Sequence, residues 1–133
     1  MNKILCLIVV LLINNSLFSQ FEKSNYKNVS TKFVSFFNES KNDSIVAMFS
    51  TEMNAALPID KFTQVSTGLK SQLGSIKKIR FVRLQSASAL YETTFDKAVL
   101  GMTITLNPKN EIAGLLFRPY PDYDCRKIQL QFP

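Results

Sequence analysis

The chain has 133 residues, of which 46% are hydrophobic and 20% charged, and its formal net charge is +6. This length allows one domain, and the composition is that of a globular protein and excludes a disordered one. The chain contains no histidine, which excludes Ser-His-Asp and Cys-His catalysis and the common zinc sites.

The N-terminus predicts a secretory signal peptide over residues 1–19. Lys3 gives a short basic start, residues 4–13 form an uninterrupted apolar run, and small polar residues follow. The run is shorter than the ~20 residues that span a bilayer, and it matches the hydrophobic region of a signal peptide. We expect cleavage between Ser19 and Gln20, export to the periplasm or beyond the cell, and no transmembrane segment afterwards. A buried N-terminal strand or helix is the alternative.

Cys125 is the one cysteine that the mature chain would keep, because Cys6 lies inside the predicted signal peptide. An internal disulfide is therefore not expected, and the exported domain would depend on its hydrophobic core. Export also argues against nucleic acid as the partner of the positive charge.

The first half of the mature chain predicts helices. Apolar residues recur at spacings of three and four between residues 26 and 37, which places them on one helix face. A short second helix is expected over residues 43–49, followed by a connector at residues 54–58. The third helix would begin at Pro58 and end at Gly74. Its expected buried stripe consists of Phe62, Val65, Leu69 and Leu73.

The second half predicts strands, because the apolar period changes to two after Ser75. The expected strands are residues 76–85, 88–95, 98–106 and 111–119. Helices followed by antiparallel strands predict an α+β domain over residues 20–120, with the helices on one face of a four-stranded sheet. Residues 121–133 are expected to form a C-terminal linker and tail.

The last two predicted strands carry large apolar side chains on both faces. Pairing Leu106 with Glu111 would place Ala113, Leu115 and Phe117 on the inner face, towards the helices. The expected interface on the outer face consists of Val99, Ile112 and Leu116. A surface strand needs one apolar face, so we expect the second face to bind a second copy of the chain or a separate protein. The alternative is that the tail folds back over it.

Three stretches carry a resemblance to a known family. They are FTQVSTGLKSQLGSIKKI, YETTFDKAVLGMTITLN and NEIAGLLFRPY. Together they resemble the DUF3887 family of exported domains over residues 25–120. The resemblance implies the cystatin-like, NTF2-like superfamily, in which helices pack in the concave face of a curved antiparallel sheet. In longer relatives such a domain often precedes a serine hydrolase domain, so an accessory fragment of such an enzyme is one alternative.

Motifs that could carry chemistry are weak. S-x-x-K, the pattern of Ser-Lys hydrolases, occurs at Ser24 and Ser75 without its companion motifs, and we attribute both matches to chance. Asp122 and Asp124 offer too few oxygen atoms for a calcium site. We therefore expect no catalytic residue, no metal and no cofactor, and we interpret the chain as a non-catalytic binding or interaction module.

The space between helices and sheet is the candidate ligand site. Some members of the superfamily are enzymes that place an Asp and a Tyr there, but here the lining would be hydrophobic with one phenol. Such a lining suits a packed core or an apolar ligand better than acid–base catalysis, which needs a group with a shifted pKa. An apolar-ligand binder or a small enzyme is thus a further alternative. The candidate ligand-binding residues are Tyr91, Phe95, Met102, Leu115 and Phe117.

Overall fold

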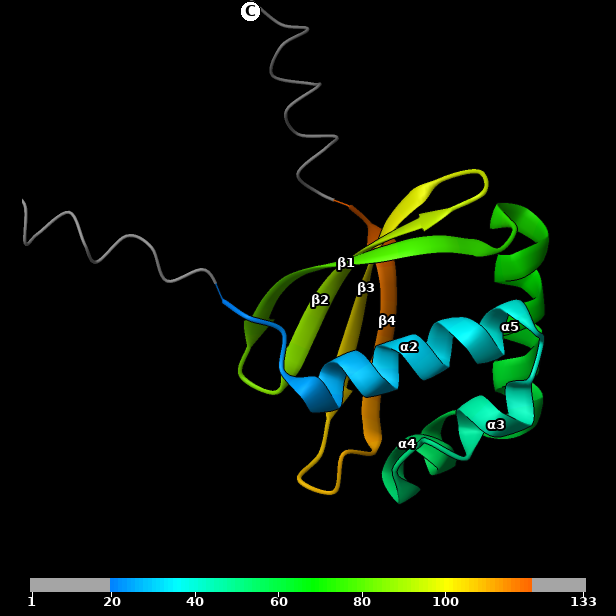
Figure 1. The fold of residues 1–133 in the computed structure, drawn as a ribbon. Helices are drawn as coiled ribbons and strands as arrows, with labels where there is room; N and C mark the ends of the chain where they lie inside the picture. Colours follow the sequence, from blue (N-terminus) through cyan, green and yellow to red (C-terminus); the bar gives the residue numbers. More distant parts are fainter. Residues whose placement is uncertain (1–19, 121–133) are drawn as a thin grey trace, which may run out of the picture.

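The computed structural model describes residues 20–120. The predictions about the signal peptide, Cys125, the acidic pair Asp122 and Asp124, and the tail lie outside these residues. Within them, helices precede an open antiparallel sheet of four strands (Figure 1). The predicted α+β class is confirmed.

Each strand pairs with the next one in the chain, giving the order β1-β2-β3-β4. The elements are α2 (Ser24–Asn38), α3 (Asn42–Val46), α4 (Thr51–Ala56), α5 (Ile59–Leu73), β1 (Ile76–Gln85), β2 (Ser88–Phe95), β3 (Val99–Leu106) and β4 (Ile112–Pro119). Helix α2 crosses the sheet, and α5 stands beside one end of it (Figure 1). We call the sheet face that α2 covers the inner face, and the opposite one the outer face.

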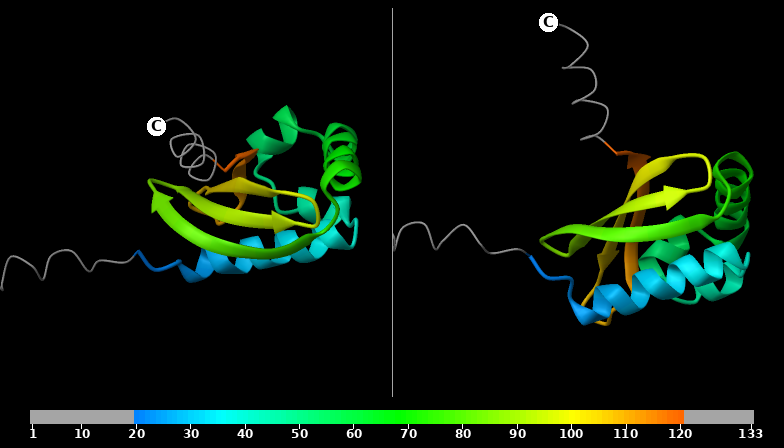
Figure 2. Two further views of the ribbon diagram at one scale, coloured as in Figure 1. Left: turned by 90° about the horizontal axis from the view of Figure 1, so that it is seen from above. Right: turned by 45° about the horizontal axis from the view of Figure 1, so that its top comes forward.

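Helix α2 supplies much of the core. It buries Tyr26, Ser30, Phe33 and Phe37, which recur at the three- and four-residue spacing of one helix face. The ring of Phe33 lies 6.1 Å from that of Phe117 on β4, and the ring of Phe37 lies 6.0 Å from that of Phe95 on β2. Aromatic contacts therefore hold α2 along one side of the curved sheet (Figure 2).

Helix α4 occupies part of the segment that the sequence predicted to be a connector. The Ser50 side chain caps it by accepting a hydrogen bond of 3.1 Å from the backbone N–H of Met53. None of its residues is buried, so the sequence shows no periodic apolar stripe there. The helix was missed for this reason.

Helix α5 buries Phe62 and Ser66, whereas Val65 is 56% exposed. The prediction that Val65 belongs to the buried stripe is wrong. A helical residue advances by about 100° around the axis, which places Val65 about 60° to one side of Phe62. The ring of Phe62 packs edge-on against that of Phe49, with centroids 5.3 Å apart, and this contact fixes which side of α5 faces the core.

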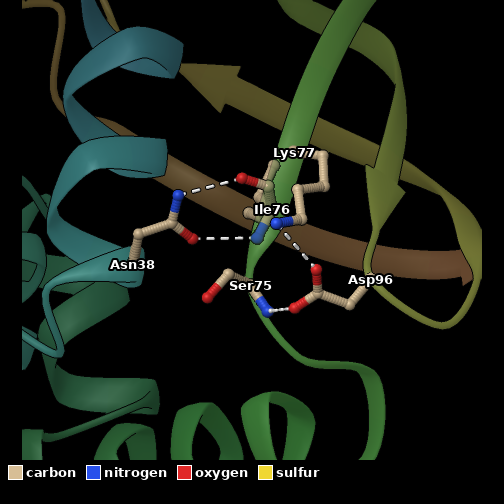
Figure 3. Close-up of polar contacts among 5 residues, drawn as sticks. All are labelled: Asn38, Ser75, Ile76, Lys77 and Asp96. Carbon is tan, nitrogen blue, oxygen red and sulfur yellow. Dashed lines mark hydrogen bonds and ion pairs between the residues drawn. The ribbon is translucent and has the colours of Figure 1, made fainter.

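A cluster of polar contacts joins the ends of several elements (Figure 3). The Asn38 side chain at the end of α2 donates to the Ile76 carbonyl at 2.9 Å and accepts from the Ile76 N–H at 2.8 Å. Asp96, in the turn between β2 and β3, accepts a 2.7 Å hydrogen bond from the Ser75 N–H and pairs with Lys77 at 3.1 Å. These contacts fix the start of β1 relative to α2 and to the β2–β3 turn.

The register of the β3–β4 hairpin differs from the predicted one. Leu106 pairs with Ile112, and a bulge then shifts the pairing so that Thr105 faces Gly114. The turn contains Asn110 with a φ of 61°, a left-handed conformation that asparagine tolerates better than most residues. The extra residue, Ala113, is exposed instead of lying in the core.

The position of Ile112 also differs from the predicted one because of this bulge. The sequence placed it on the outer face, but its side chain is fully buried in the core. Its N–H donates to the Met48 carbonyl at 2.8 Å, and its carbonyl accepts from the Ser50 N–H at 2.9 Å. The segment between α3 and α4 thus pairs with the edge of β4 and holds Ile112 inward. Beyond the bulge, Leu115 and Phe117 pack against the core as predicted.

Candidate functional site

The inner face is filled by side chains of the chain itself. Tyr91, Phe95 and Met102 are buried, and Leu115 and Phe117 are partly buried and pack against the same core. The rings of Phe95 and Phe117 lie 6.1 Å apart, within the range of aromatic pairing. A ligand bound among these residues would have to displace packed rings, so they act as core in this structure.

The phenol of Tyr91 serves to anchor the N-terminal segment. Its hydroxyl donates a hydrogen bond of 2.7 Å to the carboxylate of Glu22, while the Gln20 side chain accepts one of 2.8 Å from the Leu84 N–H. Burial is the main cause that raises the pKa of Tyr91 above its usual value, and the hydrogen bond to Glu22 raises it further. The phenol therefore stays protonated at neutral pH and does not have the lowered pKa of a catalytic base.

The outer face carries a groove of about 630 Å³. Its lining residues come from all four strands and from the turn between β1 and β2. They are Arg83, Gln85, Ser86, Ser88, Leu90, Gly101, Thr103, Arg118 and Pro119. The volume lies in the range of ligand sites, and the lining combines two guanidinium groups with hydroxyls and a few apolar surfaces.

The two arginines of this groove give it a positive charge. Arg83 and Arg118 are exposed, and neither forms an ion pair with any acidic residue in the range 20–120. Arg80, next to the groove, differs because it pairs with Glu92. The hydrogen bond to Glu92 is the main cause that raises the pKa of Arg80. The carboxylate of Glu92 is thus engaged by Arg80.

Gly101 lies in the middle of the outer face, between Glu92 on β2 and Arg118 on β4. A Cβ atom at this position would lie 3.3 Å from Leu90 Cδ1 and 3.5 Å from Tyr120 Cδ2. Tyr120 is only 6% exposed. The missing side chain of Gly101 thus lets the ring of Tyr120 lie close to the sheet, and part of the outer face is covered by the chain's own residue.

Two apolar residues of the predicted interface remain exposed on the outer face. Val99 is 41% and Leu116 44% exposed, while Ile112 is buried and does not belong to this surface. Sequence reasoning missed Arg83 and Arg118 as a pair. Their strand positions put each on an outward-facing side, but only the register across four strands shows that they line one groove.

Comparison with protein families supplies a relationship that the groove itself does not reveal. The family described as "Protein of unknown function (DUF3887)" matches residues 30–115. The chain belongs to this family. The DUF3887 match extends from α2 into β4 and includes Arg83, Gly101 and Thr103, while Arg118 lies beyond it. The superfamily and the position in front of a hydrolase domain stay predictions. Searches of curated proteins and of solved structures found no match.

Residues 20–120, which the structure describes, contain neither a membrane-spanning helix nor a cluster of metal-binding side chains. No helix in this range is long and apolar enough to cross a membrane. The same range holds no group of three or more acidic, cysteine or histidine side chains arranged to bind a metal ion.

Proposed function

We propose that this DUF3887 domain is an exported, non-catalytic binding module whose binding surface is the outer face of the sheet. The observation that carries the proposal is the groove of about 630 Å³, which lies beside the exposed side chains of Val99 and Leu116. Exposed apolar side chains next to a preformed groove are the features expected of an interaction site. The inner face, by contrast, is packed with aromatic rings such as those of Phe95 and Phe117.

The chemistry of the groove favours binding over catalysis. Its polar groups are guanidinium, amide and hydroxyl groups, and a guanidinium stays protonated in proteins and cannot accept a proton. A hydroxyl nucleophile needs a neighbouring base, and within residues 20–120 no carboxylate or histidine lines this groove. These lining groups suit the binding of an anionic or polar partner better than the transfer of a proton.

Charge favours a separate partner over a second copy of the chain. The charged residues in the range 20–120 that line the groove, Arg83 and Arg118, are both positive. A symmetric contact between two outer faces would bring these arginines together, and like charges in an interface are unfavourable. We therefore assign the outer face to a different protein.

Export is supported by the apolar run at residues 4–13 and by the contacts of the residues that follow the predicted cleavage site. Gln20 and Glu22 bond to the sheet through their side chains. Cleavage before Gln20 would leave both hydrogen bonds intact, so the mature domain would keep its anchored N-terminal segment.

The proposal is tested by purification of the tagged chain from its native host. Wild type, Leu116→Lys and Val65→Lys are compared, because Val65 is also exposed but lies on α5. At least one protein should co-purify with the wild type and with Val65→Lys and be lost with Leu116→Lys, at an unchanged melting temperature. An identical set of proteins in all three samples, or no co-purifying protein at all, would exclude the outer face as the binding surface.

A further inference from the structure

We propose that the groove on the outer face binds the carboxylate side chains of an acidic polypeptide segment, with Arg83 and Arg118 as the two anchoring groups. This inference rests on the proposed function and names the chemistry of the partner. It assigns to the two arginines a role that neither the family match nor the fold supplies.

Both arginines lie on the outer face, one on each of the two outermost strands of the sheet. Arg83 on β1 faces Leu90 on β2, whereas Arg118 on β4 faces Gly101 on β3. Neighbouring strands lie ~4.8 Å apart, so the backbones of β1 and β4 are separated by roughly 14 Å, which equals about four residues of extended chain. One extended segment with acidic residues at i and i+4 could thus reach both guanidinium groups.

The local charges direct acidic groups to these two positions. Glu92 is held by Arg80, so it does not neutralise Arg83 or Arg118. Arginine binds carboxylates through two parallel hydrogen bonds, which fixes orientation as well as charge. The groove floor offers Leu90 and the hydroxyl of Thr103 between the two sides, which suits a chain that presents both apolar and polar groups.

A polypeptide fits this surface better than a free phosphate does. Leu116 faces Thr103 across the β3–β4 pairing, so an exposed apolar side chain lies directly beside the groove. A phosphate ion would engage the arginines but leave this side chain in water. A segment with acidic residues at i and i+4 and an apolar residue at i+2 contacts both, because every second side chain of an extended chain points to the same side.

The experiment uses the protein isolated from its native host with ¹⁵N label. The probe is a capped peptide, Glu-Ser-Leu-Ser-Glu-Ser, compared with the peptide in which glutamine replaces every glutamate. Arg83→Gln and Arg118→Gln are compared with Lys32→Gln, a matched loss of one charge at an exposed position of α2. Binding is followed by the amide resonances of Gly101 and Thr103.

We expect the acidic peptide to shift these resonances and the glutamine peptide to leave them unchanged. Each arginine variant should weaken binding about tenfold or more, as expected for the loss of a charge-assisted hydrogen bond. Lys32→Gln should weaken it less than about twofold. Equal effects of all three substitutions would reduce the binding to net charge and overturn the inference.

Other occupants of the groove give different results. Response to tripolyphosphate but not to the acidic peptide would identify an anion site and overturn the inference. Shifts of these amide resonances that grow with protein concentration alone would indicate a second copy of the chain and would also overturn the inference. Shifts caused by Asp122→Asn or Asp124→Asn would indicate the chain's own tail, with the same consequence. If the peptide fails but Leu116→Lys still releases a co-purifying protein, the inference falls and the proposed function stands.

Discussion

Ile112 and Leu116 occupy the same strand and are both large aliphatic residues, but their surroundings differ. Ile112 is fully buried, and both of its backbone groups bond to the segment between α3 and α4. Leu116 is 44% exposed and faces Thr103 on the outer side of the sheet. The bulge at Ala113 creates this contrast, because it turns Ile112 inward while Leu116 remains outward.

Substitution of these two residues should therefore have unequal costs. Ile112→Ala should lower the free energy of unfolding by about 2–5 kcal/mol, since it leaves a cavity in the core. Leu116→Ala should change it by less than about 1 kcal/mol. Urea unfolding followed by circular dichroism measures both values. Similar costs for the two variants would show that the assigned register is wrong.

The elements show which parts of the fold follow from local sequence. The bounds of β1 and β2 agree with the predicted strands because apolar alternation is a local signal. Helix α4 buries no side chain and gave no such signal. The β3–β4 register depended on the left-handed turn at Asn110 and on pairing of Ile112 with residues some 60 positions earlier in the chain, and neither contact is visible in the period of the strand.

The same distinction applies to the candidate site. The alternation of side chains between the two faces of β2 and β3 correctly predicted that Tyr91 and Met102 face inward. The outer groove could not be predicted, because Arg83 and Arg118 come from strands that do not pair with each other. Recognition of the groove required the register of all four strands together, and that register includes bulges in β1 and β4.

The contacts of Asp96, in the turn between β2 and β3, test how this turn is held against the start of β1. Gly74 has a φ of 83°, and a Cβ there would lie 2.3 Å from Asp96 Oδ2. The backbone hydrogen bond from Ser75, and then the contact with Lys77, lower the pKa of Asp96. A carboxylate with a lowered pKa stabilises the fold above its unfolded pKa, and this stabilisation is lost as the pH falls through the folded pKa.

Asp96→Asn should therefore lower the melting temperature at neutral pH. The difference from the wild type should shrink as the pH falls below the ordinary aspartate value of 3.8 and vanish once Asp96 is protonated in both states. Thermal unfolding across this pH range measures the effect. A difference that persists unchanged at low pH would mean that the substitution acts through packing and not through charge.

In the molecule as a whole, the two faces of the sheet differ in packing and exposure. The inner face is closed by α2 and by the aromatic contacts of Phe33 and Phe37. The outer face combines a groove, two exposed arginines that line it and two exposed aliphatic residues. The large apolar groups on both sides of β4 are explained by this division, since one set forms the core and the other is available to a partner.

Export of the protein is a further prediction. Mass spectrometry of the protein from its native host should find a mature form that begins at Gln20, because the apolar run at residues 4–13 is followed by a small polar segment. A cytoplasmic protein that retains Met1 would contradict export and would restore nucleic acid as a possible partner of the positive charge.

Photocross-linking in the native host tests whether the outer face binds a different protein. Benzoyl-phenylalanine replaces Leu116 and, as the control, Val65. We predict an adduct with another protein from position 116 and none from position 65, and the cross-linked peptide should contain acidic residues. An adduct with a second copy of the chain, a cross-link within the chain itself, or an adduct from position 65 alone would contradict the claim.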